Sequence, residues 1–229
     1  HAVRALYLTS GMADLYLETG EQALLDSMLR QWHDFTAHKM YLTGSAGARH
    51  FDEAFGEPYE LPDDSGYCET CAAIASIMWN WRMLRITGQA RYAALIERTL
   101  YNGFLSGVSL DGKSFYYVNP LFVRESHARQ PWYECACCPP NVMRLIASIN
   151  RYLVTVSVRE VQVHQYASAR FEAEVPEAGS VRLSMETDYP WDGLVRIGVD
   201  DAGSGNWTLR LRIPDWCGAA QVQVNGQPA

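Results

Sequence analysis

The sequence predicts a mainly α-helical domain followed by a β-rich one. Over about the first 152 residues, apolar side chains recur at three- and four-residue intervals, as on one face of a helix. After this segment the pattern changes, and Val154, Val156 and Val158 alternate with other residues, as is typical of strands. Turn sequences such as Asp201–Gly205 separate the later strand segments. We therefore expect a helical domain over 1–152 and an antiparallel β-sandwich over 153–229.

Glycine and proline set the limits of the helices expected in the first domain. Gly20 ends the first helix, and Gly88 separates the third helix from the fourth. Pro139 and Pro140 open the last helix, since proline suits the first turn. The expected helices span residues 2–18, 21–36, 69–85, 90–106 and 139–152.

A long irregular loop and five strand segments complete the predicted elements. Residues 41–66 contain four glycines and two prolines, which break both helical and strand patterns. Loops longer than about 12–15 residues inside a compact domain are usually functional. The acidic side chains of this loop, among them Glu57 and Glu60, are expected to lie in solvent. The strand segments cover residues 154–163, 180–186, 194–199, 206–213 and 221–224.

The composition excludes several functional classes. Apolar residues make up 48% and charged residues 20% of the 229 residues, which is typical of a globular protein rather than a disordered one. The formal net charge of −7 argues against nucleic acid as a partner, because binding to phosphates needs an excess of Lys and Arg. No apolar run reaches the ~18–20 residues of a membrane span, so we expect no membrane association. The chain begins with His1 rather than Met, which predicts that it is part of a longer protein.

Five of the six cysteines fall into two short clusters, at 68–71 and at 135–138. Disulfide frameworks serve mainly small secreted domains that lack a sufficient core, and this chain is long enough to bury one. The adjacent residues Cys137 and Cys138 also disfavour a mutual disulfide, because a vicinal bridge is strained. Clustered free thiols therefore indicate metal ligands or nucleophiles in a reducing compartment.

The two cysteine clusters contain enough donors for one zinc site. Glu69 and Cys71 stand at the start of a predicted helix, where the chain can turn both side chains to one point. Cys137 and Cys138 precede the helix opened by proline and can supply the other two ligands. Three thiolates and a carboxylate leave a net charge of about −2 around a divalent ion, which the positive ends of two helices tolerate. The rival ligands in these clusters are Cys68 and Cys135.

Five sequence blocks occur in the order found in a known enzyme family. The blocks are YELPDD at 59–64, YCETCA at 67–72, ERTLYNG at 97–103, FYYVNPL at 115–121 and CACCPPN at 135–141. Through these blocks the first domain resembles glycoside hydrolase family 127, the β-L-arabinofuranosidases. The segment WTLRLRIPDW at 207–216 is similar to the β-domain that follows the catalytic domain in that family.

The resemblance implies a fold and a reaction. The first domain is expected to be part of an (α/α)6 barrel, with appended antiparallel β-sandwiches, and the reaction to be zinc-dependent glycoside hydrolysis with retention. The substrate implied is a terminal β-L-arabinofuranose, or a related sugar, in an arabinose-containing oligosaccharide or glycoconjugate. The reducing compartment that the cysteines indicate leads us to expect a location in the bacterial cytoplasm, and a homodimer is left open as the assembly. Since the predicted helices make only part of such a barrel, we expect these 229 residues to be inactive alone.

The resemblance also implies a role for each member of the proposed metal site. Cys137 takes the position of the zinc-bound nucleophile, and the other ligands are Glu69, Cys71 and Cys138. A zinc ion supplies what a lone cysteine lacks, namely deprotonation at neutral pH.

Three further residues match the family's catalytic and sugar-binding positions. Glu53 matches the acid/base glutamate, whereas His1 and Tyr117 match a histidine and a tyrosine that bind the sugar. An alternative from another functional class stays open, namely a non-catalytic carbohydrate-binding relative with a structural zinc site. That alternative predicts binding of zinc and sugar without turnover.

Overall fold

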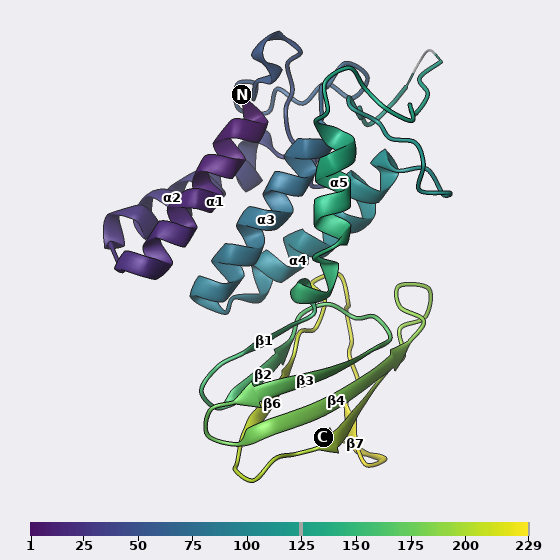
Figure 1. Cartoon of the computed structure of the whole chain (residues 1–229). Coiled ribbons are helices and arrows are strands. Elements are labelled where there is room, and N and C mark those ends of the chain that lie inside the picture. Colours follow the sequence, from purple (N-terminus) through teal and green to yellow (C-terminus); the bar gives the residue numbers. More distant parts are fainter. Residues whose placement is uncertain (124–125, 229) are drawn as a thin grey trace. The chain divides into compact units, whose positions relative to one another are not determined.

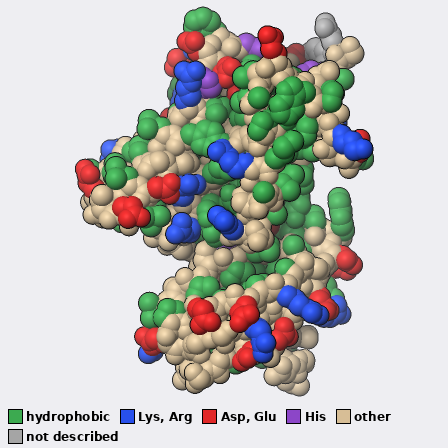
Figure 2. Space-filling view, viewed as in Figure 1, with side chains coloured by type: hydrophobic (Ala, Val, Ile, Leu, Met, Phe, Trp, Pro, Cys, Tyr) green, Lys and Arg blue, Asp and Glu red, His purple; other side chains and the backbone are tan. Residues whose placement is uncertain are grey.

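The computed structural model describes residues 1–123 and 126–228 of the chain. The chain divides into two compact units, His1–Ser148 and Ile149–Ala229, and each is described by itself (Figure 1). Helices make up most of the ordered elements of the first unit and strands those of the second, as the change of sequence pattern predicts. On the face drawn in Figure 2, acidic and basic side chains are interspersed rather than gathered by sign. Within the described residues, no helix has the length and apolar character needed to span a membrane.

Three of the five helices of the first unit begin and end close to the predicted limits, whereas the one predicted over 90–106 ends as an α-helix at Thr99 and continues as π-helical and 3-10 turns to Gly107. The five helices are α1 (Ala2–Thr19), α2 (Gln22–Asp34), α3 (Thr70–Thr87), α4 (Ala90–Thr99) and α5 (Cys138–Ile146). Gly20 and Gly88 end α1 and α3 with φ angles of 69° and 65°, a left-handed conformation that suits glycine. The predicted helix over 139–152 is shorter than expected, because α5 ends at Ile146 and only a 3-10 turn, Ile149–Tyr152, follows.

Helix α3 forms the core of the first unit. It contacts α1, α4 and α5 (Figure 1). Its side chains are therefore buried nearly all round. The small residues Ala72 and Ala73 let the neighbouring helices approach closely, whereas Ile77 and Met83 fill larger spaces. Burying a side chain of the latter size stabilises a fold by about 1.5–3 kcal/mol. Because α3 is held from several sides, the residues at its N-terminal end have a fixed place.

The loop over 41–66 folds back onto the helical unit. At Gly44 the φ angle is +85°, and a Cβ atom there would lie 2.9 Å from Cα of Thr99, so only glycine allows this approach. Beyond the loop, the N–H of Cys68 donates a hydrogen bond of 2.8 Å to the carbonyl of Gly47. These contacts bring the loop next to the start of α3.

Two three-stranded sheets form most of the second unit. One sheet has the order β1 (Val154–Val156), β2 (Glu160–Val163), β6 (Thr208–Leu211), and the other has the order β3 (Ala169–Val175), β4 (Gly179–Thr187), β5 (Val195–Asp201). A two-stranded ribbon, β7 (Gln223–Val224) with β8 (Gln227–Pro228), follows. Buried Val161, Val175, Val181 and Leu183 come from strands of both sheets and form one hydrophobic cluster.

Two features of this second unit differ from the prediction. Strands β2 and β6 are parallel, with Glu160 opposite Thr208, so the expectation of a purely antiparallel arrangement is wrong at this pair. The whole second sheet lies in the chain between them, and it serves as the long crossover that a parallel pair needs. Strand β3 lies outside the predicted segments, because small alanines and charged residues, which are poor strand formers, occupy most of its positions.

Candidate active site

Four predicted metal ligands meet where two helices begin. Glu69 directly precedes α3 and Cys71 lies in its first turn. Cys137 directly precedes α5, which begins at Cys138 and packs against α3. The sulfur of Cys71 lies 3.1 Å from that of Cys137 and 3.5 Å from that of Cys138, and Oε1 of Glu69 lies 3.2 Å from the Cys137 sulfur. The four donor atoms all lie within 4.8 Å of one another, and we call this group the thiol cluster.

The two rival thiols lie outside the thiol cluster. Cys68 has a φ angle of +43°, and its thiol lies near the side chain of Tyr41 instead. Burial raises the pKa of Cys68 to about 12. Cys135 is exposed to solvent. Among the described residues, the thiol cluster is therefore the only group of side chains arranged to hold a metal ion.

The thiol cluster has the electrostatics of a metal site. Glu69, Cys71 and Cys138 are at most 1% exposed, and Oε2 of Glu69 is buried without a hydrogen-bond partner among the described residues. Burial raises the pKa of Glu69, and the nearby Cys137 sulfur raises it further. Contacts with Cys138 and Cys71 lower the pKa of Cys137, whereas contacts with Cys137 and Cys71 raise the pKa of Cys138. Four acidic groups this close cannot all ionise on their own, whereas a divalent cation would offset half of their charge and so favour their ionised forms.

The donor set is of the kind that a zinc ion would fit. Zinc prefers thiolate and carboxylate ligands in tetrahedral sites, and its bonds to sulfur are about 2.3 Å long. Sulfurs around one ion therefore lie within roughly 4 Å of one another. The sulfur separations of 3.1 and 3.5 Å meet this condition. The unpartnered oxygen of Glu69 supplies a further donor in the same buried space.

Glu53 lies beside the thiol cluster on a strained turn. Asp52 and Glu53 have φ angles of 54° and 48°, and residues other than glycine cost roughly 1–3 kcal/mol each in this region. Oε2 of Glu53 lies 3.0 Å from Nε2 of His1. The carboxyl group of Glu53 also interacts with that of Glu69, and this interaction contributes to the raised pKa of Glu69. One residue, Glu69, thus links Glu53 to the sulfur of Cys137.

Tyr117 contacts the thiol cluster from the segment between α4 and α5. Its hydroxyl is hydrogen-bonded to the sulfur of Cys137, and this contact contributes to the lowered pKa of that thiol. Its carbonyl accepts a hydrogen bond of 3.1 Å from Thr70, and its N–H donates one of 3.0 Å to the Tyr133 hydroxyl. Burial raises the pKa of Tyr117, so its hydroxyl stays protonated and can donate.

Tyr67 lies at the site, although its position in the sequence indicates no role there. Its hydroxyl is hydrogen-bonded to Glu53. Its ring packs edge-on between two others, with centroids 5.0 Å from that of His50 and 6.2 Å from that of Tyr117. Tyr67 directly precedes Cys68 in the block YCETCA, but nothing in its spacing reveals a contact with a residue fourteen positions earlier.

Asn141 is a second residue whose contact with the site was missed. Its side chain is hydrogen-bonded to Cys71, a contact that lowers the pKa of that thiol. Its Oδ1 accepts hydrogen bonds from Tyr7 at 2.9 Å and from Arg144 at 2.7 Å. The sequence did hold a signal, because Asn141 lies about one helical turn beyond Cys137 and therefore on the same face of α5.

Comparison with known families covers most of the chain. The family model described as "Beta-L-arabinofuranosidase, GH127 catalytic domain" matches residues 1–151. A second model, "Beta-L-arabinofuranosidase, GH127 middle domain", matches residues 160–229. The first match contains every residue of the thiol cluster, together with Glu53, His1 and Tyr117.

Individual relatives are similar over the whole chain. The "Non-reducing end beta-L-arabinofuranosidase" of Bifidobacterium longum subsp. longum is 37% identical, over 100% of this chain and 37% of that protein. A solved GH127 β-arabinofuranosidase is 42% identical with a TM-score of 0.94, over 100% of this chain and 38% of its own. A GH127 β-L-arabinofuranosidase structure from Geobacillus stearothermophilus T6 is 44% identical with a TM-score of 0.94, over 100% of this chain and 38% of its own.

The chain spans little more than a third of the length of these relatives. The catalytic-domain match alone covers more than half of the chain. The resemblance carried by the five sequence blocks is thereby confirmed, and the chain belongs to glycoside hydrolase family 127.

Proposed function

We propose that the protein carrying this chain hydrolyses β-L-arabinofuranosides, or glycosides of a related sugar, with retention at the anomeric carbon. The observation that carries the proposal is the series of contacts from Cys137 through Glu69 to Glu53. Through these contacts the thiol of Cys137 lies near the carboxyl group of Glu53. Retention needs two such groups about 5–5.5 Å apart, one to attack and one to protonate the leaving oxygen. The relatives' names support the sugar, so the substrate is an arabinose-containing oligosaccharide or glycoconjugate.

In the first step, the thiolate of Cys137 attacks the anomeric carbon. The new C–S bond forms as the bond between that carbon and the aglycone oxygen breaks. Glu53 enters this step as the acid and gives its proton to the departing oxygen, so that the aglycone leaves as a neutral alcohol. The sugar is then held on the sulfur of Cys137.

In the second step, the carboxylate of Glu53 acts as a base. It takes a proton from a water molecule whose oxygen attacks the anomeric carbon. The C–S bond breaks, and Cys137 leaves as a thiolate. Because each step inverts the anomeric carbon, the released arabinose keeps the configuration of the substrate.

The other residues of the thiol cluster set the state of the nucleophile. Glu69, Cys71, Cys137 and Cys138 would hold zinc, which when bound keeps the cysteine sulfurs deprotonated at neutral pH. The Tyr117 hydroxyl, hydrogen-bonded to the Cys137 sulfur, orients that sulfur and stabilises negative charge on it.

His1 and Tyr117 are the proposed sugar-binding residues. The Nε2 atom of His1 lies against Glu53, whereas its Nδ1 atom is buried without a partner among the described residues. This free nitrogen can bond a sugar hydroxyl beside the acid/base. The hydroxyl of Tyr117 lies next to the nucleophile, so both ends of the site contact the same small sugar ring.

We also propose that the helices are part of an (α/α)6 barrel over 1–152 and the sheets part of a β-sandwich over 153–229. Leu8 on α1 and Met143 and Ile146 on α5 are more than half exposed, and apolar side chains gather over α5 in Figure 2. Clustered exposed apolar residues usually mark a surface that another element covers. The thiolate chemistry suits a reducing compartment, so the proposed location is the cytoplasm.

The proposal is tested by trapping the sugar on the nucleophile in the full-length protein. Glu53→Gln loaded with an aryl β-L-arabinofuranoside should accumulate a pentosyl adduct, because the second step lacks its base. Mass spectrometry of the peptide that contains Cys137 locates the adduct. Cys137→Ser, compared at equal zinc content, should lose turnover by more than about 1,000-fold.

Cys135→Ser is the matched control, since this exposed thiol lies two residues from the nucleophile and outside the thiol cluster. It should keep both zinc and turnover. A non-catalytic sugar-binding protein with a structural zinc would instead show no turnover before substitution and no sugar on any cysteine. That result would replace the proposed function with the alternative.

A further inference from the structure

The turn that carries Glu53 is closed at a narrow neck. Asp52 and Glu53 both adopt a left-handed backbone, which side chains with a Cβ atom rarely do. At the neck, the N–H of Arg49 donates to the carbonyl of Ala54 at 3.0 Å, and the N–H of Ala54 donates back to Arg49 at 3.1 Å. Arg49 and Ala54 are therefore the two ends of the turn, and their backbones are held together.

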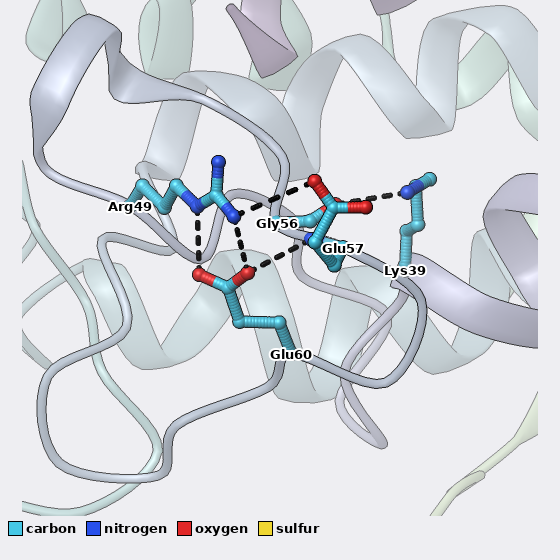
Figure 3. Close-up of polar contacts among 5 residues, drawn as sticks. All are labelled: Lys39, Arg49, Gly56, Glu57 and Glu60. Atoms are coloured by element: carbon cyan, nitrogen blue, oxygen red, sulfur yellow. Dashed lines mark hydrogen bonds and ion pairs between the residues drawn. The ribbon is translucent and has the colours of Figure 1, made fainter.

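The side chain of Arg49 reaches from this neck to the far arm of the loop (Figure 3). Its Nε donates to Oε1 of Glu60 at 2.7 Å and its Nη2 to Oε2 at 2.5 Å, which makes a two-pronged ion pair. Oε2 of Glu60 also accepts the N–H of Glu57 at 2.9 Å. The expectation that Glu60 is a free, solvated carboxylate is therefore wrong. We call this pair the Arg49–Glu60 clamp.

Two further contacts attach the clamp to the helical body. Lys39, at the end of the π-helical turn that follows α2, donates a hydrogen bond of 2.8 Å to the carbonyl of Gly56 (Figure 3). Gly56 lies directly under the side chain of Glu60, since a Cβ atom on it would come within 2.7 Å of the Glu60 Cβ. The clamp thus fixes the loop against a helix rather than only against itself.

We propose that Arg49 and Glu60 are positioning residues that hold the carboxyl group of Glu53 in place for proton transfer. This inference rests on the proposed acid/base role of Glu53. The clamp closes the chain between residues 49 and 60, and Glu53 lies inside the closed segment. Proton transfer needs hydrogen-bond reach between the acid and the leaving oxygen, so a small displacement of the turn slows it strongly.

The test compares leaving groups in the full-length protein, with kcat/KM as the readout. An alkyl β-L-arabinofuranoside needs a proton on its departing oxygen, whereas 4-nitrophenolate leaves without one. Arg49→Ala and Glu60→Gln should each lower kcat/KM for the alkyl substrate by about 10–100-fold, and for the nitrophenyl substrate by less than about threefold. Arg49→Lys should fall between, because a lysine cannot make the two-pronged contact.

Arg82→Ala is the matched control for an ion pair of the same unit. Arg82 binds Asp14 at 2.8 Å, and its loss should leave both substrates unchanged. If Arg49→Ala and Glu60→Gln lower both substrates equally, or neither, the clamp has no positioning role. Zinc content and melting temperature show whether each variant folds. If Arg49→Ala does not fold, the test of the clamp rests on Glu60→Gln, which keeps the shape of the side chain.

Glu53→Gln separates this inference from the proposed function. A selective loss on the alkyl substrate in Glu53→Gln, with no selective loss in the clamp variants, rejects the clamp and keeps the function. If Glu53→Gln has the same kcat/KM as the unaltered protein on both substrates, the acid/base role of Glu53 is rejected, and the clamp proposal with it.

Discussion

The sulfur atoms of Cys71 and Cys137 lie 3.1 Å apart, although 66 positions separate the two residues in the chain. Each stands at the N-terminal end of a helix, and the packing of α3 against α5 brings these two ends together. The partial positive charge of a helix N-terminus favours the anionic form of a thiol. Helix packing, rather than the long loops, therefore sets the geometry of the thiol cluster.

The first prediction concerns the metal. Cys71→Ser should weaken zinc binding by more than about 100-fold, because even residues that only support a ligand contribute about 10–100-fold. It should also lower the melting temperature of the zinc-treated protein, since α3 and α5 lose the ion that joins them. Zinc per chain is measured after dialysis against a competing chelator. Cys217→Ser, outside the thiol cluster, is the control, and equal zinc retention by both variants would contradict the assignment.

A second prediction follows from the hydroxyl of Tyr133. It accepts the N–H of Tyr117 at 3.0 Å and donates to the carbonyl of Phe115 at 2.7 Å. Tyr133→Phe keeps the ring and removes both bonds, which should cost about 1–3 kcal/mol in the free energy of unfolding. Because Tyr117 loses its support, KM should rise severalfold while kcat changes less.

Urea unfolding and steady-state kinetics check this second prediction. Tyr116→Phe is the control, because its hydroxyl donates instead to the carbonyl of His127 in an exposed contact of 3.0 Å. If Tyr133→Phe unfolds more easily but keeps its KM, then this hydrogen bond supports the fold and not the sugar site.

The sequence was most informative where a local rule fixes the structure. Glycine in a left-handed conformation ends α1 at Gly20 and α3 at Gly88, and both ends were predicted within about two residues. The gathering of Glu69 and the three thiols at one point was predictable, because only a few kinds of side chain serve as metal ligands. The choice between Cys71 and Cys68 was harder, since it depends on which way the start of α3 turns, and Cys68 contacts Tyr41.

Pairings between residues that are brought together by a loop or a sheet were not predictable from local sequence rules. Glu60 is paired with Arg49, eleven positions away in a segment without periodicity, so its sequence context looks like that of a solvated carboxylate. Strand β6 pairs with β2 only after the chain has built another sheet. In each case the partner is chosen by the tertiary fold, and no pattern in the nearby residues encodes it.

The third prediction uses Gly56 to open the Arg49–Glu60 clamp without removing a charge. A Cβ atom at this position would lie 2.7 Å from both Cβ and Cδ of Glu60, so Gly56→Ala must displace Glu60, its backbone included. It should show the same selective loss on alkyl substrates as Arg49→Ala. Combined with Glu60→Gln, it should add little, because both changes act on one contact. Fully additive losses in the double variant would show that Gly56 acts elsewhere.

The fourth prediction concerns the acid stability of the second unit. His164 is 4% exposed, and its Nε2 atom lies 2.7 Å from the hydroxyl of Thr155. Burial lowers the pKa of His164 to about 4, and the charge of Arg212 contributes further. In the unfolded chain the pKa of histidine is about 6.5. Below pH 6.5 the unfolded chain therefore gains a proton that the folded chain does not, so stability is complete above about pH 6.5 and is lost towards pH 4.

From pH 7 to pH 5, this difference should lower the free energy of unfolding of the second unit by about 2 kcal/mol. Urea titrations of the full chain at each pH measure it. His164→Gln can keep a hydrogen bond to Thr155 but cannot take up a proton, so its unfolding free energy should change much less over the same range. An equal fall in His164→Gln would assign the pH dependence to other groups. A flat profile in the unaltered chain would mean that His164 accepts a proton without unfolding.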